Sequence, residues 1–467
     1  MNSRRKIFCI GLALALGNVP AVRAQDRAGY TLVKIADVQT VIPGTQPVRR
    51  LHPSRVFPPP SVSADGTIAF WCGVREDALK EAPAGAVLSN PYTDVGSGIF
   101  LANAAQPDAV VAVALHGTPA AGGGNFDILF APFLATKKDG GGSLCFFGSV
   151  ATPAGESPAT PSGSEPHLFA YDLATKQLRR ALTSTRRRVP PGGFDLDTTG
   201  AINSAGRVCF GTFNAKGAQG GYFTFPVSGS AQDAAALTPA APDDVSAPFH
   251  RLTRPQISDA GEVTWSSVNV NPERGVNYGL YWMNKSGQFA PVFEQWDIAP
   301  NGRKFSRMLS QSAAINSSCN LITFAAEVDA FHGAFAYNTR TKKMELIAEY
   351  GGTAPGGIGN YTQIIGDVGV NASGTVAFAA TLLPLEPDPA RNGTDEFQAL
   401  FTQNARGVTV LVARRGDAFD GSVLTGFSTE ARCIDDKGGV AFRYDLEDGR
   451  VGIAYARARG NRTPRAQ

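Results

Sequence analysis

The strongest constraint on the fold is a short pattern that recurs along the chain. Each copy has a polar residue, two spacers, a glycine, and alternating apolar positions that end in an aromatic residue. The copies lie at 63–70, 139–146, 203–210, 258–265, 316–324, 371–378 and 435–442. The polar side chain and the glycine are typical of a tight turn, and the alternation predicts a strand with one buried face. The copy at 316–324 has one extra residue, and Asn320 takes the place of the glycine.

The spacing of the copies predicts the architecture. From Phe70 to Phe442, the intervals between the terminal aromatic residues average 62 residues. A second apolar segment follows most copies, as at 333–337, and a third comes next, as at 344–349. A turn rich in glycine and proline then leads to the next copy. This period is that of a four-stranded β-propeller blade with long loops.

The two ends of the chain complement each other. After the last copy only one further strand is predicted, at 452–456, whereas the apolar segment 31–36 precedes the first copy and has no repeat of its own. We therefore expect the N-terminal strand to complete the last blade, since closure of the ring removes exposed sheet edges. The predicted fold class is all-β, a single seven-bladed β-propeller over residues 25–460. A pair of β-sandwiches is the alternative, and it does not explain the shared missing strand.

The first 24 residues have the pattern of an export signal. Arg4, Arg5 and Lys6 precede an apolar run at 7–17, and small or apolar residues come before the expected cut ahead of Gln25. The run is shorter than the roughly 20 residues needed to span a bilayer. No cysteine stands at the cut, which argues against a lipoprotein. We predict a cleaved signal peptide at 1–24 and a periplasmic or extracellular protein.

The charge balance argues against nucleic acid as a partner. The predicted signal holds four of the 43 basic residues and no acid, which leaves 39 bases against 40 acids. Residues 461–467 form a basic tail that we expect to be flexible. No second apolar run is present, so no membrane anchor is predicted. Five widely spaced cysteines remain, and their odd number favours packing over a disulfide framework, with one bridge left open.

One copy of the repeat carries a family resemblance. Asn371, Gly374, Ala377 and Phe378 match every fixed position of an NxxGxxAF motif. The chain resembles exported bacterial proteins that carry tandem copies of this motif. The resemblance implies an extracytoplasmic β-propeller of generally unassigned function, and it brings no catalytic residues. Members often end in a surface-anchoring segment; its absence from this sequence favours a free periplasmic or secreted protein.

A polar site is predicted at one mouth of the propeller channel. When the turn aromatics of the repeats are lined up, the next residue in each repeat is polar. These residues are His52, Asp127, Asp195, His250, Ser306, Thr362 and Ser428, and Arg251 and Arg307 lie one step further on. Such a ring is able to hold a cation or a hydroxylated or anionic ligand. The alternative is that these residues cap strand starts and order channel water.

No cofactor is predicted. If a divalent metal binds, its ligands would be His52, His250, Asp127 and Asp195, because imidazole and carboxylate suit zinc, iron or manganese. The sequence has no GxSxG, HExxH, phosphate-loop or dinucleotide-binding motif.

Two functions follow from these patterns. The leading hypothesis is a non-catalytic, monomeric binding module whose partner is a small molecule, a glycan or a protein. The rival is a hydrolase or lyase that acts on an extracellular polymer and uses the four His and Asp residues of the channel mouth.

Overall fold

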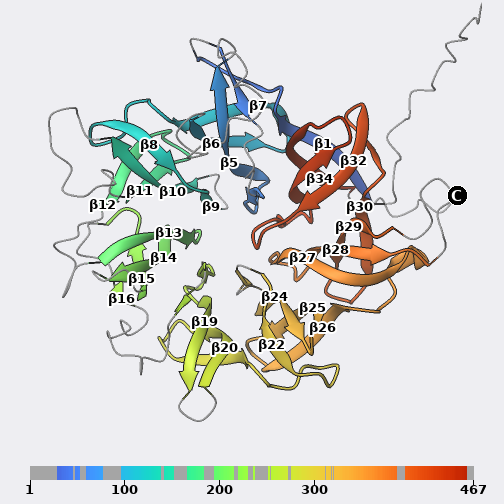
Figure 1. Cartoon of the computed structure of the whole chain (residues 1–467). Helices are drawn as coiled ribbons and strands as arrows, with labels where there is room; N and C mark the ends of the chain where they lie inside the picture. Colours follow the sequence, from blue (N-terminus) through green and yellow to red (C-terminus); the bar gives the residue numbers. More distant parts are fainter. Residues whose placement is uncertain are drawn as a thin grey trace, which may run out of the picture.

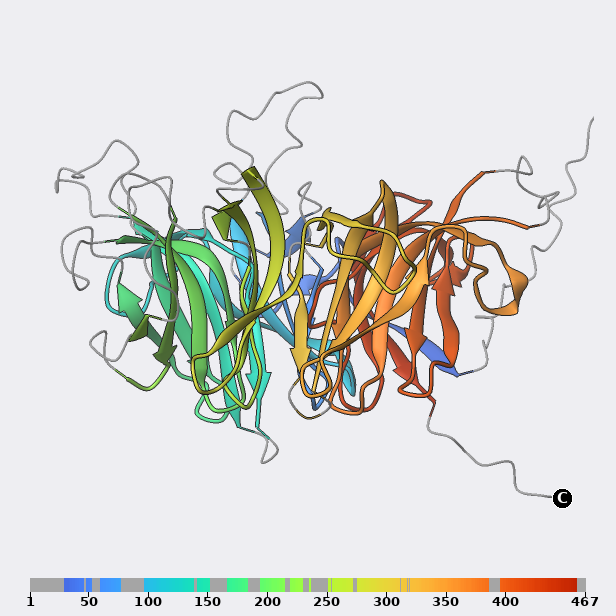
Figure 2. The same cartoon turned by 90° about the horizontal axis from the view of Figure 1, so that it is seen from below.

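Strands make up almost all of the regular structure in the computed structural model, which has a single short 3₁₀ turn, η2 (Pro355–Gly357), among its described residues. The strands form sheets that follow one another around a central axis (Figure 1), and Figure 2 shows the ring edge-on, with the strands running between its two faces. The structure therefore confirms an all-β propeller arrangement. It describes residues 29–45, 48–52, 59–76, 96–137, 141–151, 166–183, 194–214, 219–229, 235–236, 251–252, 254–271, 275–310, 312–316, 318, 320–385 and 395–459.

Each sheet contains the strand of one repeat copy and is named after it. The β5 sheet has the order β2 (Val41–Ile42), β3 (Arg49–His52), β5 (Thr67–Glu76), β6 (Ser97–Asn103), β7 (Gln106–Leu115), and β4 (Ser61–Val62) also pairs with β5. The β10 sheet has the order β12 (Leu178–Thr183), β11 (Pro166–Asp172), β10 (Gly142–Ala151), β8 (Asn125–Leu129), and β9 (Phe133–Thr136) also pairs with β10. The β14 sheet has the order β13 (Phe194–Ile202), β14 (Arg207–Asn214), β15 (Gln219–Pro226), β16 (Ala235–Ala236).

The remaining sheets follow the same plan. The β19 sheet has the order β17 (Arg251–Leu252), β19 (Val263–Asn271), β20 (Gly275–Met283), β21 (Phe289–Glu294), and β18 (Gln256–Ile257) also pairs with β19. The β24 sheet has the order β22 (Phe305–Met308), β24 (Leu321–Val328), β25 (Phe331–Asn338), β26 (Lys343–Glu349), and β23 (Ala314–Asn316) also pairs with β24. The β28 sheet has the order β27 (Asn360–Val370), β28 (Val376–Leu383), β29 (Phe397–Gln403), β30 (Thr409–Arg414). The β33 sheet has the order β1 (Tyr30–Asp37), β34 (Val451–Ala458), β33 (Val440–Leu446), β32 (Ser422–Ser428), β31 (Ala418–Phe419).

The repeat pattern forms the predicted turn and strand. At Gly374 the backbone has φ of 77°, which a residue with a side chain rarely adopts, and its N–H donates to the carbonyl of Asn371 at 3.0 Å. Asn320, which replaces the glycine in its copy, also has a positive φ, at 56°. The turn then leads into a strand at the centre of its sheet.

The asparagine of the repeat also joins neighbouring sheets. In its own turn, Asn371 accepts hydrogen bonds from the N–H groups of Ser373 and Thr375 through Oδ1. Its Nδ2 donates to the carbonyl of Asp435 in the next sheet at 2.8 Å. Asn203 makes the equivalent bond to the carbonyl of Ser258 at 3.0 Å. The side chain thus closes its turn and ties it to the next copy.

The N-terminal strand completes the last sheet, as the sequence predicted. β1 pairs antiparallel with β34, from Tyr30 opposite Ala458 to Asp37 opposite Gly452. The two strands lie side by side in Figure 1, where the two ends of the colour scale meet. The ring is therefore closed by hydrogen bonds between the two ends of the described chain.

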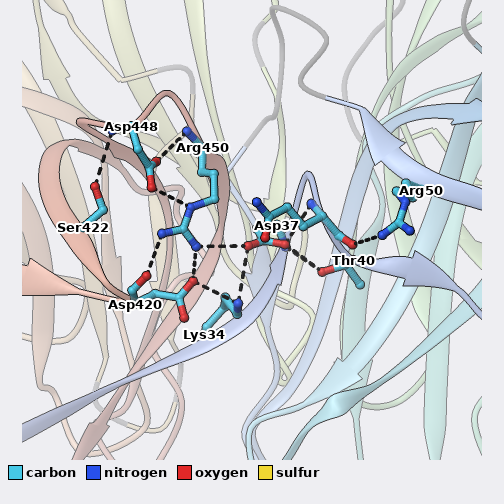
Figure 3. Close-up of polar contacts among 9 residues, drawn as sticks. Lys34, Asp37, Thr40, Arg50, Asp420, Ser422, Asp448 and Arg450 are labelled. Carbon is cyan, nitrogen blue, oxygen red and sulfur yellow. Dashed lines mark hydrogen bonds and ion pairs between the residues drawn. The ribbon is translucent and has the colours of Figure 1, made fainter. Parts of the chain in front are cut away.

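Ion pairs reinforce this closure (Figure 3). Arg450 lies beside Asp420 and Asp448, and it reaches Asp37 of β1 at 3.7 Å. Lys34 of β1 pairs with Asp420 at 2.9 Å and with Asp37 at 3.4 Å. These five residues are called the closure network here. They join β1 to the turn between β31 and β32, which contains Asp420, and to the turn between β33 and β34, which contains Asp448 and Arg450.

Hydrophobic clusters lie between neighbouring sheets. Trp71 of the β5 sheet and Phe146 of the β10 sheet belong to one cluster of buried residues, and Cys209 of the β14 sheet shares another with Trp265 of the β19 sheet. The four described cysteines, Cys72, Cys145, Cys209 and Cys433, are buried free thiols, which confirms their predicted packing role. Face-to-face burial of this kind holds the ring together.

Some predictions concern residues outside the described ones. The signal peptide at 1–24 and the basic tail at 461–467 are among them. Within the described part of the chain, no helix is long and apolar enough to cross a membrane.

Candidate functional site

The predicted channel-mouth residues lie on the strands that precede the repeat turns. The described ones are His52 on β3, Asp127 on β8, Ser306 and Arg307 on β22, Thr362 on β27, and Ser428 on β32. Asp195 is on β13 and Arg251 on β17, but their side chains, and all of His250, are outside the described residues.

The contacts of these residues are local. Arg307 pairs with Glu327 on the neighbouring strand at 3.0 Å, and Asp127 accepts a long bond from the Ser149 hydroxyl at 3.4 Å. Burial and the nearby Arg75 lower the pKa of His52. No group of three or more His, Cys, Asp or Glu side chains within the described ranges is arranged to hold a metal ion. Because two of the four suggested metal ligands cannot be placed, the metal site stays a prediction.

Two cavities lie on the axis of the ring. The larger, of about 210 Å³, is lined by residues of every sheet at or just before the repeat turns, among them Val62, Thr136, Ile257, Ile315, Val370 and Ile434. The smaller, of about 110 Å³, is lined by Ser61, Phe133, Thr199, Arg254, Glu430 and others. Gln256, Ala431 and Arg432 line both. Of the predicted channel-mouth residues whose side chains the structure describes, none lines either cavity.

Arg432 stands between the two cavities. It belongs to the segment that joins β32 to β33, and its side chain crosses to two other sheets. Nε donates to Gln256 Oε1 at 3.1 Å, one terminal nitrogen to the carbonyl of Leu134 at 2.9 Å, and the other to the carbonyl of Ile257 at 3.0 Å. Burial lowers the pKa of Arg432, and the carboxylates of Asp259 and Glu430 oppose that shift. The guanidinium is thus held in a fixed position inside the channel.

Glu430 borders the smaller cavity two residues before Arg432. Its position inside the ring removes most of the water that would stabilise its charge, and this burial raises its pKa to about 8. The charges of Arg254 and Arg432 favour the ionised form, whereas the charge of Asp367 opposes it. At neutral pH the side chain is therefore mainly protonated and able to donate a hydrogen bond.

Two hydroxyl groups at the cavities are buried without a hydrogen-bond partner among the described residues. Ser61 is 2% exposed and lines the smaller cavity, and Thr136 is 7% exposed and lines the larger one. Buried polar groups are almost always paired, so an unpaired one beside a cavity indicates a place for water or a ligand. The channel therefore offers donors on both sides of Arg432.

Sequence reasoning missed Glu430 and Arg432, although a signal was present. Arg432 stands three residues before the polar residue of its repeat. The same position in the other six copies holds Pro60, Thr136, Gly200, Pro255, Ala313 and Val368. A charged residue where the other copies have uncharged ones is the deviation that marks the channel.

Residues 171–458 match the model of a family described as a family of unknown function (DUF7453). The chain belongs to this family. In this DUF7453 member the matched region contains Arg254, Glu430 and Arg432, whereas Ser61 and Thr136 precede it. No curated protein sequence matches the chain.

Several solved structures resemble this DUF7453 protein over most of its length. An oligogalacturonate lyase in complex with manganese has 11% sequence identity and a TM-score of 0.46, covering 93% of this chain and 98% of its own. The β-propeller domain of the Trilobed protease from Pyrococcus furiosus has 10% identity and a TM-score of 0.46, covering 85% of this chain and 92% of its own. TolB from Acinetobacter baumannii has 12% identity and a TM-score of 0.32, covering 68% and 63%. Similarity at this level says nothing about activity.

Proposed function

We propose that this DUF7453 member is an exported, non-catalytic ligand-binding protein. In this proposal it is a seven-bladed β-propeller closed by β1, and its ligand occupies the central channel beside Glu430 and Arg432. The observation that carries the proposal is a pair of ionisable side chains that border two cavities on the ring axis. Groups with perturbed pKa values in a cavity are candidates for a functional site.

The energetics of the channel favour binding over a purely structural role. Arg432 forms hydrogen bonds between sheets. Glu430, in contrast, gains no stabilisation of its charged form from its position, because burial raises its pKa to about 8. Burying an ionisable group costs free energy and does not stabilise a fold by itself. A half-buried acid that loses most of its hydration beside a cavity is better explained by a ligand that it contacts.

The size of the cavities favours a small molecule over a glycan or a protein. One water molecule needs roughly 10–15 Å³ of cavity volume. The cavities of about 210 and 110 Å³ therefore accommodate several non-hydrogen atoms each, but not a polymer chain.

Export is supported by the pattern of residues 1–24 and by the resemblance to exported proteins with NxxGxxAF repeats. Secretion of the full chain with loss of residues 1–24, read by mass spectrometry of the secreted or periplasmic product, tests this part of the proposal. A product that retains its first residues in the cytoplasm contradicts it.

A thermal-shift screen of residues 25–467 tests the site. The probes are divalent metals, sugars and organic acids, and the variants are Arg254→Gln in the channel and His52→Ala at the predicted channel mouth. A compound at 100 times its dissociation constant stabilises by about 2.7 kcal/mol. We expect a shift that Arg254→Gln abolishes and His52→Ala retains. The reverse pattern would move the site to the channel mouth and favour the hydrolase or lyase hypothesis.

A further inference from the structure

We propose that the smaller cavity binds a short-chain monocarboxylate, held by the guanidinium groups of Arg254 and Arg432 and by a hydrogen bond from the carboxyl group of Glu430. This inference rests on the proposed function, because it names the class of ligand for the same channel.

The charged groups that line the cavity are mainly cationic. Arg254 enters from the segment between β17 and β18, and Arg432 from the segment between β32 and β33. The carboxyl group of Glu430 is mainly neutral at pH 7, because burial raises its pKa to about 8. Two guanidinium groups beside a neutral acid favour an anion, which can accept charge-assisted hydrogen bonds from them.

The other titratable groups that face this pair do not line the cavity. Asp367 is 5% exposed and accepts hydrogen bonds from the hydroxyl and the N–H of Ser312. Asp259, which faces Arg432, lines only the larger cavity and accepts from the N–H of Ser204 at 2.8 Å. The Cys433 thiol, which also faces Glu430, is buried, and burial raises its pKa so that it stays neutral.

The cavity offers several hydrogen-bond donors. The Ser61 hydroxyl is buried without a partner among the described residues. The three bonds of Arg432 to Gln256, Leu134 and Ile257 use three of the five N–H donors of a guanidinium. An ionised carboxylate is a pure acceptor with two oxygens, so it complements this set.

The remaining lining favours a short apolar tail. Phe130, Pro132 and Phe133 form one side of the cavity. Its volume of about 110 Å³ restricts the ligand to a few carbon atoms. Inorganic phosphate and sulfate have no apolar part to place against these rings, and this distinguishes them from a monocarboxylate.

Binding is expected to depend on pH with a defined sign. Below about pH 8 Glu430 is protonated and donates to the ligand, whereas above this pH its negative charge repels the ligand. Affinity should therefore fall as pH rises above 8, by up to about tenfold per pH unit. Glutamine at this position donates from its amide at every pH, so Glu430→Gln should keep the affinity and lose the pH dependence.

Isothermal titration of residues 25–467 with acetate, propionate and butyrate at pH 6.5 to 9.5 tests the proposal, with chloride and inorganic phosphate as comparison anions at equal ionic strength. We expect saturable binding of at least one carboxylate, a loss of more than tenfold in Arg254→Gln, and no change in Arg406→Gln, an exposed turn residue. Ser61→Ala, which should weaken binding several-fold, replaces Arg254→Gln if that variant does not fold.

Three outcomes would overturn the proposal. One is carboxylate binding no tighter than that of chloride or phosphate, another is a pH dependence that persists in Glu430→Gln, and the third is full affinity in both Arg254→Gln and Ser61→Ala. If a sugar or a metal stabilises the protein through Arg254 while carboxylates do not bind, the proposed channel function stands and this ligand class is wrong. If no probe of any class binds, both fail.

Discussion

The closure network and the channel cluster both consist of charged side chains that join distant parts of the chain, yet their environments differ. In the closure network (Figure 3), hydrogen bonds to Asp448 and Asp420 outweigh partial burial and raise the pKa of Arg450. In the channel, which contains Arg254, Asp367, Glu430 and Arg432, burial dominates. It raises the pKa of Glu430 and lowers that of Arg432, which disfavours the charged form of each.

The difference indicates what each cluster is for. Every cation of the closure network contacts an anion, so its charges are matched at a site that remains partly hydrated. Such an arrangement stabilises a joint between strands. In the channel, Glu430 and Arg432 border the cavities, and no close ion pair among the described residues matches their charges. That arrangement is suited to a ligand.

The largest effect is expected for Arg432→Ala. Removing this side chain leaves the carbonyl groups of Leu134 and Ile257 without their donor inside the ring. We expect a loss of about 3–5 kcal/mol in the free energy of unfolding, measured with urea, and little dependence on salt. Arg406→Ala, in an exposed turn, is the matched control. A loss below about 1 kcal/mol would show that water replaces these bonds and that the channel cluster does not hold the sheets together.

The pH dependence of stability isolates Glu430. Its pKa in the folded protein is about 8, above the ordinary value of 4.5. Between pH 4.5 and pH 8, therefore, the folded state holds a proton on Glu430 that the unfolded state has lost. This contribution is complete below pH 4.5 and is lost as pH rises to 8, at no more than about 1.4 kcal/mol per pH unit.

Because Glu430 keeps some access to water through the cavity, we expect a total of about 2–3 kcal/mol. The difference in unfolding free energy between the wild type and Glu430→Gln, followed from pH 4.5 to pH 9, measures it, because other titrations cancel. The variant should become the more stable protein at high pH. Parallel curves would mean that the carboxyl group is hydrated as in the unfolded chain.

A smaller and salt-sensitive effect is expected for Arg450→Ala. Its guanidinium contacts Asp37, Asp420 and Asp448, and its side chain is 15% exposed. We expect a loss of about 2 kcal/mol at low salt that shrinks toward about 1 M salt, where charges are screened beyond about 3 Å. Arg307→Ala, which breaks a single pair at a 58% exposed side chain, should change stability by less than about 1 kcal/mol. If salt does not change the loss in unfolding free energy caused by Arg450→Ala, strand pairing alone holds the ring closed.

The smallest effect is expected at the repeat asparagine, an uncharged joint between sheets. Asn371 and Asn404 both accept backbone N–H bonds in their own turns, but only Asn371 has a bond to the next sheet, made by Nδ2. We expect Asn371→Ala to cost about 1 kcal/mol more than Asn404→Ala in urea unfolding. Equal losses would show that the repeat asparagine acts only within its turn.

Much of the fold was predictable because it depends on local chemistry. The turn at Asn371 and Gly374 needs a side-chain acceptor and a residue tolerant of positive φ, and both are visible in the sequence. The unpaired segment at 31–36 likewise predicted the pairing of β1 with β34. The candidate site was harder to predict, because short strands such as β4, β9, β18 and β23 follow the predicted positions and place different residues at the cavities.

Three features can be read from the amino-acid sequence alone: the repeat, the alternation that buries one face of each strand, and the need for the first strand to complete the last sheet. These follow from interactions between residues close in the chain or from a count of strands. Other contacts arise only in the folded ring: Arg432 bonds to Gln256 and Leu134, and Glu430 lies beside Arg254, at separations of more than 170 residues. The physical reason is that desolvation depends on what surrounds a side chain, and in a closed ring the surroundings of the axis come from every repeat.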